Sequence, residues 1–259
     1  MKMDTRRFEV RLANSDSDVR AAQNLRYRVF VEEMGADVSA QDHAAKIEQD
    51  RFDPYFDHLM LIDTTVAPGE HGDNVVGVYR LMRGEAARDG VGFYGAGEYD
   101  LSKLENTPRK TVELGRSCVA KAYRGGVGMH LLWDGLGDYV TSNNIEIMFG
   151  VASFHGADVA PLAEALSFLH HKHLAPEDLR VRALPEHYVS LNQMPMDAVD
   201  QKSALRTIPS LIKAYLRLGG MVGDGAFIDH DFNTVDVCLL MDTKRMVSKY
   251  REFYARKRG

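Results

Sequence analysis

The chain has 259 residues, of which 45% are hydrophobic and 27% are charged. This composition is typical of a soluble globular protein and excludes a disordered or fibrous one. A formal net charge of -5 argues against a protein that binds nucleic acid over a wide surface. The 2 cysteines, Cys118 and Cys238, are too few for a disulfide framework and lack the spacing of a zinc site.

The two ends of the chain give expectations about location. The N-terminal residues MKMDTRRFEVRL contain basic side chains but lack the apolar core of a signal peptide, and no apolar run has the length of a membrane span. We therefore expect a cytoplasmic protein. The C-terminal segment is rich in basic residues, namely Lys244, Arg245, Lys249, Arg251, Arg256, Lys257 and Arg258. Such a segment forms a solvated helix, or docks to an acidic protein or to the anionic inner face of the cytoplasmic membrane.

Patterns in the first third of the chain predict a strand, a helix and two further strands. The helix spans residues 15–35, with Ser15 or Asp16 as its N-cap and Gly35 just past its end. Its apolar stripe consists of Ala22, Leu25 and Val29. The predicted strands cover residues 8–13, 58–65 and 74–82, and the last two are joined by a turn-rich segment.

The rest of the chain alternates strands and helices after a polar, glycine-rich stretch. The predicted strands cover residues 111–119, 145–154 and 180–185, the predicted helices cover residues 128–143, 158–174 and 208–220, and residues 223–241 predict a final hairpin. No repeat or clear linker interrupts this order, so a single mixed domain is the economical interpretation. The layout predicts an α/β (α+β) fold whose central sheet is mixed, mainly antiparallel and able to splay open. Ligand sites of open α/β sheets lie where strands separate.

The stretch VELGRSCVAKAYRGGVGMHLLW joins a strand to a helix and draws attention as a site. In a regular strand Glu113 and Arg116 point to opposite faces, because they are three residues apart. A one-residue bulge near Gly115 would bring them to one face and leave backbone N–H groups facing a cleft. Downstream, residues 124–128 (RGGVG) offer further N–H groups and a helix N-terminus, which favour phosphate. The combination suits a long thioester arm that ends in a phosphate.

Several segments of the chain resemble a known family. ELGRSCVAKAYRGG, LRYRVF, DRFDPYFDH and VGVYRL are similar to the acyltransferases that make lyso-ornithine lipid, which are relatives of the GNAT N-acetyltransferases and of the acyl-homoserine-lactone synthases. The similarity continues through residues 152–185 and 211–242 and covers nearly the whole chain. It implies a GNAT-like acyl-CoA N-acyltransferase fold in a single domain, 1–259, with a core of about residues 1–160 and a family-specific part of about residues 161–259 packed on it.

The resemblance also implies a reaction. A 3-hydroxyacyl group would pass from acyl carrier protein to the α-amine of L-ornithine, as the first step of ornithine lipid biosynthesis. The phosphopantetheine thioester of 3-hydroxyacyl carrier protein would be a co-substrate, with no permanently bound cofactor. Because the product would be a single-chain lipid, we expect peripheral contact with an anionic membrane and no nucleic-acid partner.

The sequence pattern that the family shares falls here on Arg26, Phe30, Asp50, Asp53, Arg80, Glu113 and Arg116. One departure concerns the phosphate loop. In acetyltransferases Gln or Arg is usually followed by two spacers, Gly, one spacer and Gly or Ala, whereas Arg124 is followed by GGVG, one residue out of step. Acetyl-CoA therefore fits poorly as donor, and a carrier protein, whose arm has one phosphate near the site, fits better. The residues expected to bind the acyl chain and its arm are Ser117, Cys118, Val119, Arg124, Gly125 and Gly126.

Aminolysis of a thioester needs a neutral amine and a stabilised oxyanion, whereas a thiol leaves without much help. We expect Glu113 to be the general base, with a purely structural ion pair to Arg116 as the alternative. The backbone of residues 117–119 is expected to stabilise the oxyanion. Arg80 or Arg116 would hold the carboxylate of the acceptor. Its distal ammonium would meet Asp50, Asp53 or Asp57, unless these acids only order Arg26.

Other polar residues have simpler explanations. Turn chemistry accounts for Asp229, Asp231 and Asp236, although Asp229 and Asp231 also stand as candidate acceptor-binding residues. The histidines His170, His171 and His173 close a predicted helix, where cationic side chains suit the dipole, so we expect no metal site. For Cys118, packing explains the residue better than nucleophilic catalysis, because no His partner is evident.

Four alternatives to this function stay open at this point. The acceptor could be glutamine or another amino acid. Lactone synthesis from S-adenosylmethionine is disfavoured by the long C-terminal similarity. A membrane-active lysin should carry a long amphipathic or spanning segment, and none is visible in the sequence. A non-catalytic binding module is disfavoured by Glu113 and the arginines.

Overall fold

The computed structural model describes residues 7–125, 127–230 and 232–246, and the chain packs into two compact units. Unit 1 comprises Met1–Val91 and Leu114–Asn144, and unit 2 comprises Gly92–Glu113 and Ile145–Gly259. Strand β5 (Thr111–Val119) begins in unit 2 and ends in unit 1. These bounds follow packing rather than the sequence-based division near residue 160, and the single-domain organisation stays a prediction.

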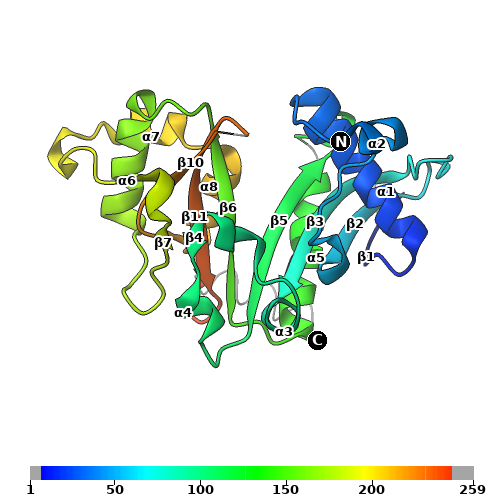
Figure 1. Ribbon diagram of the computed structural model, residues 1–259, viewed down its shortest axis with the longest axis horizontal. Coiled ribbons are helices and arrows are strands. Elements are labelled where there is room, and N and C mark those ends of the chain that lie inside the picture. Colours follow the sequence, from blue (N-terminus) through cyan, green and yellow to red (C-terminus); the bar gives the residue numbers. More distant parts are fainter. Residues whose placement is uncertain (1–6, 126, 231, 247–259) are drawn as a thin grey trace. The chain divides into compact units, whose positions relative to one another are not determined.

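Unit 1 contains strands in the order β1-β2-β3-β5 (Figure 1). Besides the end of β5, the strands are β1 (Phe8–Leu12), β2 (Asp57–Asp63) and β3 (Val75–Arg83), which pair antiparallel. The helical elements are α1 (Asp16–Arg26), the π-helix η2 (Tyr27–Glu33), α2 (Ala40–Ala45), the 3₁₀ turn η3 (Asp53–Tyr55), α3 (Gly84–Asp89), the 3₁₀ turn η5 (Lys121–Tyr123) and α5 (Gly128–Ser142). The predicted strands are confirmed, but the helix predicted over residues 15–35 is α-helical only in its first half.

Helices α1 and α5 pack on opposite faces of the strands of unit 1. Side chains alternate along a strand, so Met60 joins the apolar core beside α1, whereas its neighbour Leu61 faces the start of α5. A glycine lets α5 approach the sheet closely, since a Cβ atom on Gly135 would meet the side chain of Val10 on β1. The apolar residues of β2 are thus buried on both faces.

Unit 2 contains strands in the order β5-β6-β11-β10-β8, with β9 on β11. Its strands are β6 (Ile147–His155), β8 (Tyr188–Val189), β9 (Met221–Val222), β10 (Ala226–Asp229) and β11 (Thr234–Asp242), with β4 (Tyr99–Asp100) and β7 (Arg182–Ala183) in a separate pair. Its helices are α4 (Ser102–Glu105), α6 (Ala163–His173), α7 (Gln201–Thr207) and α8 (Ser210–Arg217), and its 3₁₀ turns are η4 (Tyr94–Gly97), η6 (Ala160–Leu162), η7 (Pro185–His187) and η8 (Met196–Ala198).

The pairing in unit 2 is mixed and mainly antiparallel, as predicted. Strands β6 and β11 are antiparallel along their full lengths, and β10 and β11 form the predicted C-terminal hairpin. Strand β5 is parallel to β6, and their paired residues are Thr111–Glu113 and Ile147–Phe149. No helix in the described part of the chain is long and apolar enough to span a membrane.

Candidate functional site

A buried group of arginines and acids lies in unit 1, and we call it the arginine network. It consists of Arg26, Glu48, Asp50, Asp53, Arg80 and Arg116. Arg26, at the end of α1, is 0% exposed and donates hydrogen bonds to Glu48 at 2.6 Å and to both carboxylate oxygens of Asp53 at 2.8 Å. Arg80, on β3, donates to Asp50 at 2.8 Å and to Asp53 at 2.6 Å. Guanidinium and carboxylate groups are equal in number, so their charges balance.

Asp53 is the centre of this network. Gln23 donates to its Oδ2 atom at 2.9 Å, in addition to the bonds from Arg26 and Arg80. Burial alone would raise the pKa of Asp53, but the hydrogen bonds and charges of Arg26 and Arg80 outweigh burial and hold the pKa well below its usual range. The geometry therefore gives Asp53 the role of ordering the two arginines, and contact of Arg26, Asp50 or Asp53 with an acceptor stays a prediction.

Arg116 has an uncommon backbone conformation within β5. Its φ angle is 48°, in the left-handed region, so the irregularity lies one residue after the predicted position at Gly115. A residue other than glycine pays about 1–3 kcal/mol for such a conformation. The Arg116 Nε atom donates to Glu48 at 3.0 Å, and Nη2 lies 3.7 Å from Asp50. The network thus includes a strained residue. Its member Glu48 was not indicated by any sequence pattern.

Glu113 lies in unit 2, where the backbone of η4 holds its carboxylate. The side chain is buried, and its Oε2 and Oε1 atoms accept the N–H groups of Tyr94 at 2.8 Å and Gly95 at 2.6 Å. A backbone N–H group can only donate, so Glu113 is held as an acceptor, which is the form that a general base needs. No sequence pattern indicated these donors beyond the glycine-rich composition of residues 83–110.

Glu113 and a group of acids share one face of the sheet in unit 2. Paired residues of neighbouring strands face the same side, and so do residues two apart in one strand. Glu113 pairs with Phe149 of β6. Four positions later on β6, Ser153 pairs with Asp236 of β11. Asp236 is therefore on the same face as Glu113.

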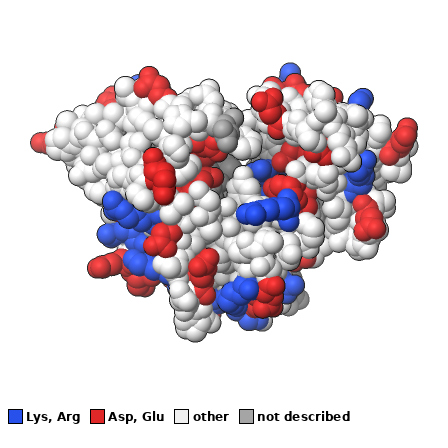
Figure 2. Space-filling model, viewed as in Figure 1, with Lys and Arg blue, Asp and Glu red and all other residues white. Residues whose placement is uncertain are grey.

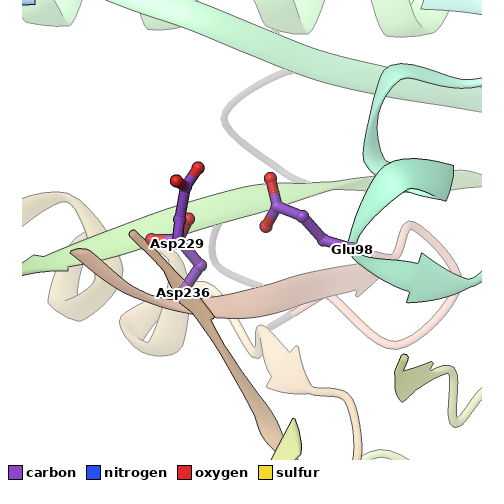
Figure 3. A group of neighbouring side chains, drawn as sticks. All are labelled: Glu98, Asp229 and Asp236. Carbon is purple, nitrogen blue, oxygen red and sulfur yellow. The ribbon is translucent and has the colours of Figure 1, made fainter. Parts of the chain in front are cut away.

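Glu98, Asp229 and Asp236 form what we call the acidic cluster, in which one carboxylate oxygen from each residue lies within 4.8 Å of the others (Figure 3). Asp229 ends β10 and Asp236 lies within β11, and the Glu98 side chain extends towards both from the residue after η4. Burial raises the pKa of Asp236 to about 6, and the charge of Asp229 adds to the rise.

The acidic cluster changes the interpretation of three predicted residues. Turn chemistry is confirmed for Asp229, whose Oδ1 atom accepts the N–H group of Phe232 at 2.9 Å. For Asp236 the turn explanation is wrong, because this residue lies inside β11. Asp231 lies outside the described residues. Glu98 was missed, because its closeness to the hairpin depends on the tertiary fold.

The residues predicted to bind the acyl arm lie at the end of β5 and after it. Cys118 belongs to the apolar core beside α1, against which Phe30 also packs, and burial raises the pKa of its thiol to about 12, which favours packing over nucleophilic catalysis. The Val119 carbonyl accepts a hydrogen bond from Arg124 at 2.8 Å. Ser117 is half-buried, Gly125 has a φ of 71°, and Gly126 lies outside the described residues.

Only the start of the basic C-terminal segment is described. Lys244 pairs with Glu146 at 2.7 Å, and Arg245 lies 3.7 Å from Asp242. The other basic residues of the segment, Lys249, Arg251, Arg256, Lys257 and Arg258, lie outside the described residues. Over much of the face drawn in Figure 2, basic and acidic side chains lie close to one another.

Comparison with known proteins identifies the family. The family model described as acetyltransferase (GNAT) domain matches residues 25–134. The L-ornithine N(alpha)-acyltransferase of Rhodobacter capsulatus is 52% identical over 250 residues, which is 96% of this chain and 95% of the relative. That of Brucella abortus is 48% identical over 249 residues, which is 95% of this chain and 88% of the relative.

A solved structure supports the fold. FeeM, an N-acyl amino acid synthase from uncultured soil microbes, is similar with a TM-score of 0.53 at 10% identity, over 93% of this chain and 96% of that chain. The GNAT-like fold expected from the sequence is thereby confirmed. Given the whole-length similarity to the two curated relatives, the chain belongs to the L-ornithine N(alpha)-acyltransferase family.

Proposed function

We propose that this protein transfers an acyl group from an acyl thioester to the α-amine of L-ornithine. The observation that carries the proposal is the similarity, over 96% and 95% of the chain, to relatives named L-ornithine N(alpha)-acyltransferase. A further part of the proposal is that the donor is 3-hydroxyacyl carrier protein, so that the product is lyso-ornithine lipid. The out-of-step loop after Arg124 supports a donor with a single phosphate near the site.

The proposed chemistry is direct aminolysis without a covalent acyl-enzyme. Glu113 takes a proton from the α-ammonium group, and the amine nitrogen then attacks the carbonyl carbon of the thioester. The resulting tetrahedral oxyanion collapses, the carbon–sulfur bond breaks, and the departing thiolate takes the extra proton of the attacking nitrogen, which leaves a neutral amide and a free thiol. A positioned general base contributes about 10²- to 10⁴-fold to the rate. The burial of Cys118 supports a route that uses no cysteine nucleophile.

The remaining predicted residues take binding roles in this proposal. The backbone N–H groups of residues 117–119 stabilise the oxyanion, and Arg124, Gly125 and Gly126 receive the phosphate of the arm. Arg80 or Arg116 holds the carboxylate of the acceptor. Arg26, Asp50 and Asp53 are positioning residues in this proposal, because their bonds fix the other members of the network. The basic C-terminus docks to the acidic carrier protein and to an anionic membrane.

The experiment that tests the function uses the purified full chain. The protein is incubated with 3-hydroxyacyl carrier protein or with 3-hydroxyacyl coenzyme A, together with a mixture of amino acids, and the products are identified by mass spectrometry. We expect Nα-acyl-ornithine, formed faster from the carrier protein. Acylation of glutamine in preference to ornithine would overturn the assignment of the acceptor. Equal rates with both donors would overturn the assignment of carrier protein as the donor. If no acyl-amino acid forms from any acceptor, the proposed activity is wrong.

A further inference from the structure

We propose that the acidic cluster of unit 2 binds the side-chain ammonium group of the acceptor and so selects amino acids with a cationic side chain. The inference rests on the proposed function, since it takes a diamino acid as the acceptor. It gives a role to Glu98, which no sequence pattern singled out, and to Asp236, which the sequence assigned to a turn. These are specificity-determining residues, separate from the bond-forming step at Glu113.

Two buried oxygen atoms in this place lack a hydrogen bond of good geometry. Asp236 is 4% exposed and Thr234 is 8% exposed. Within the described ranges, Oδ1 of Asp236 and Oγ1 of Thr234 make no hydrogen bond of good geometry, although Ser153, Thr234 and Glu98 lie close enough to the Asp236 carboxyl to lower its pKa. Thr234 pairs with Asp229 and lies two residues before Asp236, so its hydroxyl group is on the face of the sheet that carries the cluster. A buried polar atom without a partner costs about 1–3 kcal/mol, a cost that a bound hydrogen-bond donor removes.

A primary ammonium group matches the chemistry of the acidic cluster. Such a group has three N–H donors and no acceptor. The cluster offers carboxylate oxygens from three residues within 4.8 Å of one another, and the hydroxyl of Thr234 lies beside them. Hydrogen bonds between ionised partners are roughly twice as strong as neutral ones. A Mg²⁺ or Ca²⁺ ion takes about six or more oxygen ligands, so water would have to supply several.

The acidic cluster lies on the same face of the sheet as Glu113, two strands away from it. The β6 partners of Glu113 and Asp236 are four residues apart, or about 13 Å along the strand. Cys238 lies between them, opposite Val151. Burial raises the pKa of the Cys238 thiol, and the charges of Glu113 and Glu98 add to the rise. Glu113 and Glu98 are therefore both near enough to Cys238 for their charges to act on its thiol.

A single turn connects these two carboxylates. Gly95 donates its N–H group to Glu113 at 2.6 Å, and its carbonyl accepts the N–H group of Glu98 at 3.1 Å. The spacing of the two acids is thus set by the few residues of η4 rather than by a long loop. This turn therefore limits the length of an acceptor that presents its α-amine to Glu113 and its distal ammonium to Glu98.

The arginine network suits a distal ammonium less well. Both carboxylate oxygens of Asp53 already accept hydrogen bonds from Arg26, and Oδ1 also accepts one from Arg80. An ammonium group at Asp53 would have to displace a buried guanidinium group, which would then lose its own partner. Removing one partner of a buried ion pair costs about 3–5 kcal/mol. Oδ2 of Asp50 also lacks a hydrogen bond, but it lies 3.7 Å from the guanidinium group of Arg116. Oδ1 of Asp236 likewise lacks a hydrogen bond, and its neighbours in the cluster are carboxylates.

The test compares two acceptors of equal carbon chain, L-ornithine and L-norvaline, which lacks the distal ammonium. Glu98→Gln and Thr234→Val are assayed with both, and Asp100→Asn is the matched control, because Asp100 is exposed and lies two residues from Glu98. We expect Glu98→Gln to raise KM for ornithine about 10- to 100-fold with a smaller change in kcat, and to leave kcat/KM for norvaline unchanged. Thr234→Val should lower kcat/KM for ornithine alone, by a smaller factor. Asp100→Asn should change kcat/KM for neither acceptor.

Calorimetry on the same proteins separates the inference from the proposed function. Ornithine, norvaline and Mn²⁺ are each titrated into wild type and Glu98→Gln, so binding is measured even if no acyl transfer occurs. Ornithine binding that weakens selectively in the variant supports the inference. Equal losses for ornithine and norvaline, or loss of ornithine selectivity in Asp100→Asn, would overturn it. Tight Mn²⁺ binding that Glu98→Gln abolishes, with ornithine binding unchanged, would also overturn it and make the cluster a metal site.

Discussion

The backbone N–H group of Gly95 donates to Oε1 of Glu113 at 2.6 Å, and a Cβ atom added at Gly95 would lie 3.0 Å from the same oxygen. The carboxylate therefore fits against a residue that has no side chain. This relationship fixes where the proposed base stands, and it does so through the main chain of η4. A substitution at Gly95 can therefore shift this carboxylate while Glu113 itself stays in the chain.

Displacing and neutralising this carboxylate should have graded effects. Glu113→Gln should lower kcat about 10²- to 10⁴-fold, because the general base is lost. Gly95→Ala should lower kcat by a smaller factor, since the new methyl group pushes on a carboxylate that keeps its charge. Steady-state kinetics measure both. Gly97→Ala is the control, because a Cβ atom there has nothing within 4 Å; equal rates for Gly95→Ala and Gly97→Ala would contradict the positioning argument.

The arginine network should make stability depend on acid. Asp53→Asn should lower the free energy of unfolding by about 3–5 kcal/mol, because Arg26 and Arg80 lose a buried carboxylate that both contact. In the wild type the folded pKa of Asp53 lies below its unfolded value of 3.8. The stabilisation is therefore full above that value and is lost as the pH falls below it. Urea unfolding at a series of pH values measures this, and an acid dependence that Asp53→Asn leaves intact would contradict it.

The carboxyl group of Asp236 should make the folded chain less stable as the pH rises, which is opposite to the effect of Asp53. Its pKa is 3.8 in an ordinary environment and about 6 in the folded chain. The buried carboxyl is tolerated as the neutral acid, so this contribution is full below the unfolded value and is lost as the pH rises through about 6. The loss amounts to at most about 3 kcal/mol. Asp236→Asn should flatten the stability profile between about pH 4 and pH 7 in chemical unfolding, and an unchanged slope would count against burial as the cause.

The strain at Arg116 predicts a separation of stability from activity. Arg116→Gly relieves a left-handed conformation worth about 1–3 kcal/mol but removes the contacts with Glu48 and Asp50. We expect its midpoint of unfolding to stay near that of the wild type while acyl transfer is strongly reduced. Arg116→Lys keeps the strain and should be the less stable of the two. The opposite order in thermal unfolding would show that the backbone of β5 is not strained.

Cys118 should be dispensable for catalysis. The residue is buried among apolar side chains, and its thiol has a pKa of about 12. Cys118→Ala should retain kcat within about threefold and lose about 1 kcal/mol of stability. The native protein should also resist alkylation by iodoacetamide at neutral pH. Loss of turnover in a variant that remains folded would reinstate a catalytic thiol.

Local patterns predicted the elements of this fold well. Strand β5 covers the residues predicted for it, 111–119, and Ser15 caps α1 by accepting the N–H group of Asp18. Both results follow from short-range chemistry, namely alternation in strands and side-chain caps at helix starts. The π-helical turn after Arg26 was not predicted, because no residue preference separates it from an α-helix of the same apolar period.

The candidate site was predicted only where a resemblance supplied the residues. The resemblance placed Arg26, Asp53 and Arg80 among the expected site residues. It did not indicate that Glu48 completes their network. The acidic cluster was harder still, since Glu98 and Asp236 are far apart in the chain and meet through tertiary packing. The N–H donors to Glu113 have no side-chain signature at all. These parts of the site depend on backbone geometry, which residue types specify only indirectly.

The burial of the arginine network bears on how ionic strength should affect this enzyme. Arg26 and Arg80 are 0% and 1% exposed, so dissolved salt screens their ion pairs far less than it screens charges on the surface. Raising the salt concentration should therefore leave the network intact while it weakens attraction between exposed basic and acidic groups. A fall in rate with added salt would accordingly report on the encounter with a charged donor rather than on disorder of the arginine network.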